Sequence, residues 1–131
     1  IAMHTEVDLA RAALVEHACD LAEATRCAYW QTRGGDLIVP HTVGLPIERA
    51  RNHPVPIGQG LVGTAASSRS SLLGADPGPS DRSWDDRVRT STTGSLIVPL
   101  LHQDELVGVL DLRNKKQGEF DSRYWSYVLE D

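Results

Sequence analysis

The stretch SLIVPLLHQDELVGVLDLRN, residues 95 to 114, predicts a β-hairpin of two buried strands. Ser95 to Leu101 is an almost unbroken apolar run, and Leu106 to Leu112 continues it with aliphatic and β-branched residues. The four residues from His102 to Glu105 are mostly polar and predict a short connection. Pro99 has no backbone N–H to offer a neighbouring strand, so we expect the first strand to bulge or to stay unpaired there.

The second strand of this hairpin predicts that both faces of the sheet are covered. Side chains alternate along a strand, so one face receives Leu106, Leu110 and Leu112, and the other receives Val107 and Val109. A sheet that is apolar on both faces needs a layer of structure above it and another below it.

The segments around the hairpin predict an α+β domain. Short turns join most of the predicted strands, which favours an antiparallel sheet. In chain order we expect a helix from Thr5 to about Thr25, strands at Cys27 to Thr32 and Leu37 to Val43, a loop from Gly44 to Pro56 with a helical turn at Glu48 to Arg51, a helix at Leu61 to Ser68, a strand at Leu72 to Leu73, a polar loop from Asp76 to Thr93, and a final helix from Ser122.

The first predicted helix has a seven-residue apolar recurrence. Val7, Leu14 and Leu21 recur with Ala10, His17 and Ala24 three residues after each. This is the spacing of a coiled coil, but over fewer heptads than a coiled coil requires, and an amphipathic helix facing its own core also fits. We keep both readings and expect the domain to form a homodimer through this helix.

Length and composition restrict the function. The 131 residues make one domain, and the formal net charge of −5 disfavours a nucleic-acid-binding surface spread over it. No apolar run reaches the roughly 18 residues of a membrane span, so we expect a cytoplasmic protein without a membrane partner. Cys19 and Cys27 lack the spacing of metal ligands and are expected to be buried thiols, and we expect no cofactor.

Residues Gly58 to Gly63 match the glycine pattern G-x-G-x-x-G of dinucleotide-binding folds. That pattern requires a buried parallel strand directly before it, and Pro54 and Pro56 interrupt this position. The glycines are instead expected to allow a tight entry into the following helix and its close packing on the sheet.

Taken in order, several motifs resemble those of a GAF domain, a small-molecule sensing module of phosphodiesterases, histidine kinases, cyclases and transcription activators. They are Ile57 to Ala65, Leu72-Leu73 followed by Asp76, Thr93 to Leu100, Val107 to Leu110, and Asn114-Lys115 before Phe120. The resemblance implies a six-stranded antiparallel sheet with the terminal helices on one face. On the other face it implies a pocket covered by loops and short helices.

The resemblance also implies a regulatory sensor in signal transduction, as in transcription regulation or two-component systems. A small ligand would change the pocket, and dimerising terminal helices would relay the change to an output domain of a longer signalling protein, of which this chain is expected to be a fragment. The alternative is a structural dimerisation or protein-interaction module with no dedicated ligand.

The predicted pocket loop, Asp76 to Thr93, is expected to act as a lid. Its Trp84 needs apolar contact and should fold inward, while Arg87, Thr90 and Thr93 offer donors to a polar ligand. The predicted ligand-binding residues are Tyr29, Asp76, Trp84, Arg87, Thr90 and Thr93.

Asn114, Lys115 and Phe120 match part of the motif that locks the pocket in cyclic-nucleotide-binding members of the family. The acidic pair that follows in those members is replaced by Tyr124 and Trp125, so Lys115 is expected to lose its partner. Another metabolite is therefore preferred over a cyclic nucleotide.

No catalytic constellation is recognisable, and the five histidines are scattered. Family members that reduce free methionine sulfoxide, and those that attach a bilin, use pocket cysteines, whereas residues 34 to 131 contain none. We therefore expect no enzymatic activity.

Overall fold

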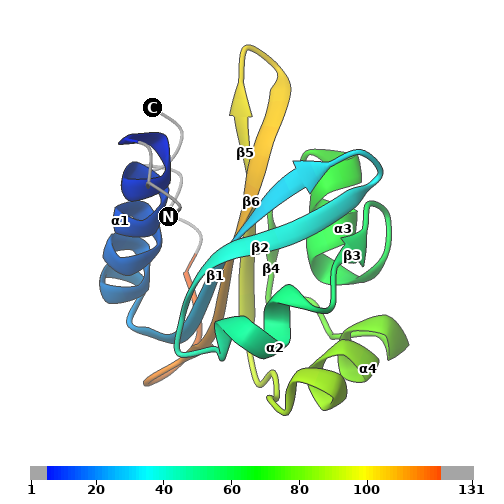
Figure 1. The fold of residues 1–131 in the computed structure, drawn as a ribbon. Coiled ribbons are helices and arrows are strands. Elements are labelled where there is room, and N and C mark those ends of the chain that lie inside the picture. Colours follow the sequence, from blue (N-terminus) through cyan, green and yellow to red (C-terminus); the bar gives the residue numbers. More distant parts are fainter. Residues whose placement is uncertain (1–5, 122–131) are drawn as a thin grey trace.

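A computed structural model describes residues 6–121 of the chain. It contains one six-stranded antiparallel sheet in the order β3-β2-β1-β6-β5-β4, which confirms the predicted α+β fold (Figure 1). The elements are α1 (Glu6–Ala22), β1 (Ala24–Arg33), β2 (Asp36–Val43), α2 (Ile47–Arg51), β3 (Val55–Pro56), α3 (Gly60–Ser68), β4 (Leu72–Leu73), α4 (Pro79–Val88), β5 (Ser95–His102) and β6 (Glu105–Lys115).

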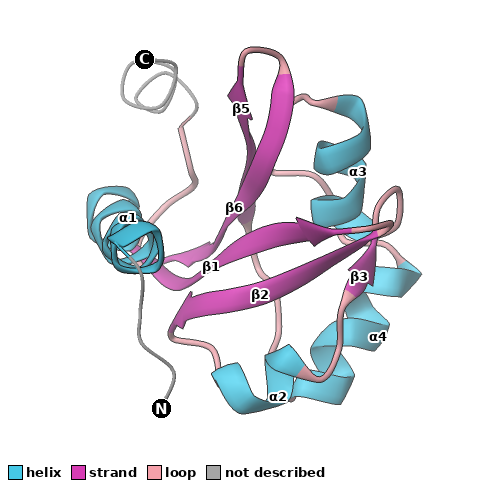
Figure 2. Cartoon of the chain, turned by 45° about the horizontal axis from the view of Figure 1, so that its top comes forward, coloured by secondary structure: helices cyan, strands magenta, loops and turns pink. Residues whose placement is uncertain are grey.

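Helices cover both faces of the sheet, as the hairpin sequence predicted. Helix α1 lies on one face, and α2, α3 and α4 lie on the other (Figure 2). Strand β1 divides its side chains between the two layers, because Cys27 and Tyr29 pack with α1 whereas Ala28 and Trp30 pack on the side of α3 and α4. Two separate hydrophobic clusters result, one between the sheet and α1 and the other between the sheet and the helices α3 and α4.

The β5–β6 hairpin is present and projects beyond the rest of the sheet (Figure 1). Its turn places Gln103 and Asp104 at positive φ, which matches the twist of the strands on either side. The register shifts so that Leu100 faces Gly108 but Leu101 faces Leu106. This bulge reverses the alternation, and Leu106 packs with the cluster of Val109 and not, as predicted, with that of Leu110 and Leu112.

Of the two outcomes expected at Pro99, a bulge or an unpaired position, the structure shows no bulge there. Pro99 pairs in register with Val109, and the irregularity comes after Leu100. The short strand β4 pairs only with Leu96 and Ile97, so the side of β5 at Pro99 has no strand partner in the described sheet. The missing N–H therefore costs no ladder hydrogen bond.

The prediction was wrong for the segment Asp76 to Thr93, which is not a loop throughout because it contains helix α4. Pro79 occupies its first turn, where a missing N–H is harmless. The buried residues of the helix are Asp81, Trp84, Asp85 and Val88, a helical spacing that the polar composition concealed.

Other boundaries differ only slightly. Helix α1 ends at Ala22 because Glu23 adopts a φ of 54°, and β1 begins at the next residue. The predicted start of α1 at Thr5 and the final helix from Ser122 lie outside the described residues. At the glycine motif, a Cβ on Gly63 would come within 2.5 Å of the carbonyl oxygen of Pro56, so α3 packs closely against β3 as expected.

Candidate functional site

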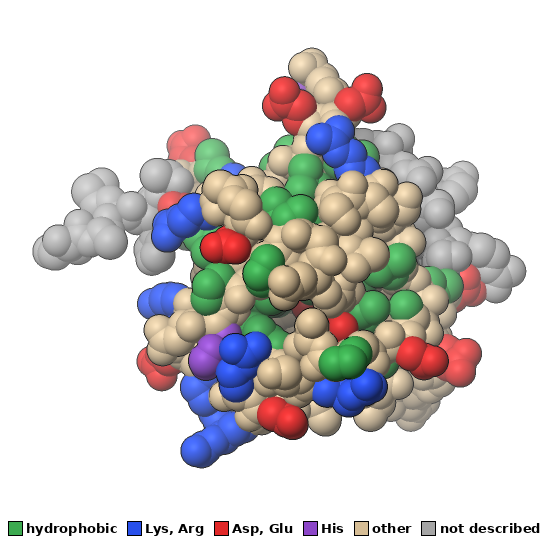
Figure 3. All heavy atoms as spheres, turned by 90° about the vertical axis from the view of Figure 1, so that its right-hand side faces the viewer, with side chains coloured by type: hydrophobic (Ala, Val, Ile, Leu, Met, Phe, Trp, Pro, Cys, Tyr) green, Lys and Arg blue, Asp and Glu red, His purple; other side chains and the backbone are tan. Residues whose placement is uncertain are grey.

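A cavity of about 300 Å³ lies beneath α4, on the face of the sheet opposite α1. In Figure 3 a hollow opens near the middle of this side of the molecule. The described residues that line the cavity are Arg26, Trp30, Pro54, Val55, Pro56, Gln59, Gly60, Val62, Pro79, Ser80, Asp81, Ser83, Trp84, Asp85, Arg87, Asp111 and Arg113.

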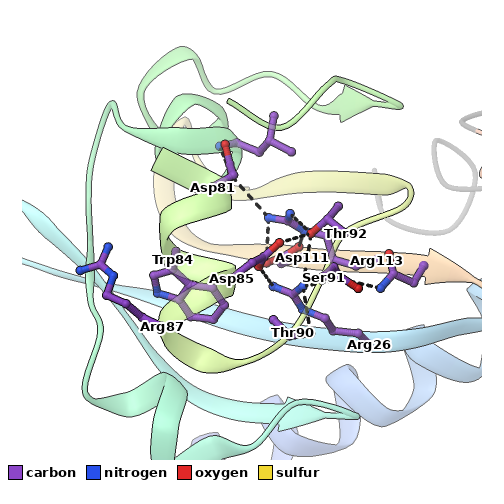
Figure 4. Close-up of polar contacts among 12 residues, drawn as sticks. Arg26, Asp81, Trp84, Asp85, Arg87, Thr90, Ser91, Thr92, Asp111 and Arg113 are labelled. Atoms are coloured by element: carbon purple, nitrogen blue, oxygen red, sulfur yellow. Dashed lines mark hydrogen bonds and ion pairs between the residues drawn. The ribbon is translucent and has the colours of Figure 1, made fainter. Parts of the chain in front are cut away.

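Arg26 on β1 anchors the segment that connects α4 to β5. Its Nη2 lies 3.1 Å from Asp85 Oδ1, and its Nη1 donates to the carbonyl of Ser91 at 3.2 Å and to the hydroxyl of Thr92 at 3.3 Å. The guanidinium also lies over the ring of Trp84, with its carbon 5.5 Å from the ring centroid. One buried cation thus holds helix α4 and the segment that follows it (Figure 4).

Arg113 on β6 is the second buried cation. Its Nε donates to Asp111 Oδ1 at 2.5 Å, and its Nη1 donates to Thr92 Oγ1 at 3.0 Å. Burial lowers the pKa of the Arg113 guanidinium, but Asp111, Asp81 and Asp85 more than offset this effect and raise the pKa above its ordinary value. Arg113 therefore stays charged at the floor of the cavity.

Two tryptophans form the apolar wall of the cavity. The rings of Trp30 and Trp84 meet edge to face, with centroids 5.5 Å apart. The indole N–H of Trp30 donates to Asp111 Oδ2 at 3.0 Å, and that of Trp84 donates to the carbonyl of His53 at 2.6 Å. Because both N–H groups have partners, the rings present carbon surface to the cavity.

Asp81 joins the beginnings of two helices. Its Oδ1 accepts from the backbone N–H of Leu61 at 3.0 Å at the start of α3, and its Oδ2 accepts from that of Gly78 at 3.2 Å at the start of α4. Helix N-termini favour a negative charge in this position. Asp81, Trp84 and Asp85 together fix α4 over the cavity.

The structure places the predicted ligand-binding residues at three different locations. Trp84 and Arg87 line the cavity, and Thr90 contacts it indirectly through Arg26 Nη1 at 3.5 Å. Asp76 and Thr93 line a second hollow of about 550 Å³ beside the end of β6.

Tyr29 lies on the opposite face of the sheet from the cavity. Its ring packs with α1 beneath the guanidinium of Arg11, and its hydroxyl donates to the carbonyl of Val107 at 3.1 Å. The next residue, Trp30, points to the cavity instead, because side chains alternate along β1.

Asn114 fastens the segment between α4 and β5. Its Oδ1 accepts from the backbone N–H of Thr93 at 2.7 Å, and its Nδ2 donates to the carbonyl of Ser91 at 2.8 Å. Lys115 has an acidic partner elsewhere, because its Nζ lies 3.2 Å from Glu23 Oε2, just after α1, whereas Tyr124 and Trp125 lie outside the described residues. Phe120 packs in the cluster under α1 and not in the cavity.

The sequence analysis missed the charged residues that dominate the site. They are Arg26, Asp81, Asp85, Asp111 and Arg113. A signal was available in the β6 sequence, where Asp111 and Arg113 interrupt a buried strand at alternate positions and so must share a face.

The two cysteines lie away from the cavity, in the cluster under α1. Burial, assisted by the neighbouring Cys19, raises the pKa of the Cys27 thiol far above its ordinary value, so it stays protonated. Within residues 6–121 no group of acidic, histidine or cysteine side chains could hold a metal ion. The helices described here include none with the length and apolar character needed to cross a membrane.

A family model described as "GAF domain" matches residues 7–125. Among solved structures, the GAF domain of a phosphoenolpyruvate-protein phosphotransferase from Coxiella burnetii has a TM-score of 0.81 at 19% identity, covering 97% of this chain and 78% of that one. A NreA protein from Staphylococcus aureus, mutated in its nitrate binding site, has a TM-score of 0.72 at 17% identity, covering 88% and 90%. A type II free methionine-R-sulfoxide reductase from Thermoplasma acidophilum has a TM-score of 0.72 at 18% identity, covering 94% and 86%. No curated protein matches the chain.

Proposed function

The chain belongs to the GAF domain family, and we propose that it acts as a sensor domain that binds a small ligand in the cavity beneath α4. The observation that carries this proposal is a concave site built from buried charged residues. Arg26, Asp85, Asp111 and Arg113 each retain no more than 8% exposure of the side chain. Burying such groups is costly, and a hydrophobic core would stabilise the fold as well without them, which favours a role in binding.

The site has a physical connection to α1. Asn114 holds the segment after α4, and its own carbonyl accepts from Thr25 Oγ1 at 2.9 Å. The next two residues reach Glu23, through the Lys115 side chain at 3.2 Å and the backbone N–H of Lys116 at 2.7 Å. A ligand that moves α4 would therefore act on the end of α1 through this chain of contacts.

Helix α1 has a surface for the proposed dimer. It packs on the sheet through Val15, Ala18, Cys19 and Ala22, whereas Val7 is 56% exposed and Leu9 is 59% exposed. Leu14 and Leu21, which continue the seven-residue recurrence from Val7, are only partly buried. Leu21 still packs against the cluster under α1, so the recurrence runs along the edge of the packed face and leaves it at Val7. We propose that a second copy covers the exposed part and that the dimer relays the signal to an output domain.

We propose that this chain is not an enzyme, although the fold also occurs in a methionine-R-sulfoxide reductase. Its described cysteines, Cys19 and Cys27, lie in the cluster between α1 and the sheet and not at the cavity. In the cavity lining, Arg26 is already paired with Asp85 and Arg113 with Asp111, and none of these four side chains is an activated nucleophile.

A second candidate function is a dimerisation or protein-interaction module without a ligand. The observation that favours it is the self-sufficiency of the network, in which each buried arginine already has an aspartate partner. On this account the charged residues only hold α4 in place.

Thermal denaturation of the chain in the presence of a metabolite panel separates the two functions. The sensor proposal expects at least one metabolite to raise the melting temperature. It also expects Ser83→Trp, at the cavity mouth, to abolish this shift, while Arg82→Trp, at an exposed position outside the lining, preserves it. If a metabolite raised the melting temperature of both variants equally, its binding site would lie outside the cavity. If no metabolite raised the melting temperature of the unmodified chain, the interaction module would be favoured.

A further inference from the structure

The buried side chains of the cavity carry two positive and three negative charges, and the positive starts of α3 and α4 offset the third carboxylate. Arg26 pairs with Asp85 at 3.1 Å, and Arg113 pairs with Asp111 at 2.5 Å. The remaining buried carboxylate, that of Asp81, is shared by backbone N–H groups at the starts of α3 and α4. Arg87 also lines the cavity but is exposed, and in Figure 4 its side chain lies apart from the network.

This balance determines which ligands the cavity can accept. A ligand with a net charge of either sign would add an uncompensated charge to a site that excludes much of the solvent. An anion bound to Arg113 would lie beside the carboxylate of Asp81, and a cation bound to Asp81 would lie beside the guanidinium of Arg113, because these two groups are only 3.9 Å apart. The cavity therefore selects for an uncharged molecule.

One polar gap remains in the network. Arg113 Nη2 and Asp81 Oδ1 lie 3.9 Å apart, and both residues line the cavity (Figure 4). This distance is too long for a hydrogen bond, so the two groups have capacity left for a third partner beside them. A ligand that offers an acceptor to Arg113 and a donor to Asp81, side by side, would complete the network.

The wall of the cavity favours a flat body behind that polar group. Trp30 and Trp84 present carbon surface, because their N–H groups donate elsewhere. Building on the proposed sensor function, we infer that the cavity binds an uncharged planar molecule with a carboxamide-like group. Its carbonyl oxygen accepts from Arg113, and its N–H donates to Asp81.

Three probes of the same shape test this inference by calorimetric titration at pH 7. Benzamide is uncharged and offers one acceptor and one donor group, benzoate is an anion with two acceptors, and benzamidine is a cation with two donor groups. We expect benzamide to bind at least 10-fold more tightly than either of the others. Tighter binding of benzoate or benzamidine, or no detectable binding of benzamide, overturns the inference.

A variant of Asp81, the residue proposed to accept from the ligand N–H, tests whether the preference for benzamide arises at this site. Asp81→Asn keeps one oxygen for Leu61 but removes a negative charge, so benzamide should lose its advantage over benzoate. Asp86→Asn, on the exposed side of the same helix and outside the lining, should leave the preference unchanged. An unchanged preference in Asp81→Asn contradicts the assigned contact.

Failure of this inference can be distinguished from failure of the sensor function. If a metabolite stabilises the chain and Ser83→Trp blocks it, but benzamide shows no advantage, the sensor function stands and the ligand class is wrong. If no metabolite and no probe binds, both proposals are wrong.

Discussion

Thr92 Oγ1 donates a hydrogen bond to Asp85 Oδ2 over 2.8 Å and so ties the segment before β5 to helix α4. The same oxygen accepts from Arg113 at 3.0 Å and from Arg26 at 3.3 Å. A single hydroxyl thus joins both buried cations to the helix that covers the cavity. This arrangement makes the covering helix and the floor of the cavity one hydrogen-bonded unit.

Replacing Thr92 with valine should destabilise the fold, because the shape is kept while the shared donor and acceptor are removed. We expect the free energy of unfolding to fall by about 1 to 3 kcal/mol, the cost of leaving buried polar groups unsatisfied. Urea denaturation measures the change. Thr64→Val, at an exposed position on α3, is the matched control and should change stability by less than about 0.5 kcal/mol.

Breaking the Arg26–Asp85 pair from one side should cost more than removing it entirely. Arg26→Met leaves Asp85 buried without its cation, and we expect a loss of about 3 to 5 kcal/mol. The double variant Arg26→Met/Asp85→Leu should recover a substantial part of that loss. A double variant that is less stable than Arg26→Met alone contradicts the view that the pair is retained for binding.

Asn114 should contribute more to the fold than its neighbour Lys115. Asn114→Ala removes contacts to Ser91 and Thr93 and places alanine at a φ of 60°, where a non-glycine residue is strained. Lys115→Ala removes an ion pair whose Glu23 side chain is 63% exposed, and such pairs contribute at most about 1 kcal/mol. Amide hydrogen exchange should accelerate across residues 90–93 in Asn114→Ala but not in Lys115→Ala. Equal exchange rates in the two variants would contradict the view that Asn114 holds this segment in place.

The stability of the chain should decline in alkaline solution through Cys27. Its pKa is raised in the folded state, so the unfolded chain loses this proton first, near the ordinary thiol value of about 8.5. The contribution of the Cys27 thiol to the free energy of unfolding is therefore fully present below that pH. Above it, the free energy of unfolding falls by up to about 1.4 kcal/mol per pH unit. Cys27→Ala should make the decline between pH 8.5 and 10 shallower, and an unchanged slope would show that the thiol does not contribute.

The elements that the sequence predicted well are those with a strong apolar pattern. Both strands of the β5–β6 hairpin and the short strand at Leu72 and Leu73 lie where they were expected. Their register was less predictable, because the bulge before Leu101 depends on how the turn at Gln103 and Asp104 closes. A change of one residue in pairing exchanges the two faces of a strand.

The site was harder to predict than the fold. Trp84 was expected to fold inward because a lone tryptophan needs apolar contact, and it does line the cavity. Helix α4 was missed because its buried face carries Asp81 and Asp85, and local patterns treat such residues as exposed. The burial of Asp85 depends on Arg26, which is distant in sequence and was not expected to be buried.

The most direct test of the ligand-binding cavity is an NMR titration that follows the indole N–H signals of Trp30 and Trp84. Both rings line the cavity, so a metabolite that stabilises the chain should shift both signals together and saturably. The same titration of Ser83→Trp should leave these two signals unchanged. Stabilisation by a metabolite without any shift of the Trp30 and Trp84 signals would contradict binding beneath α4.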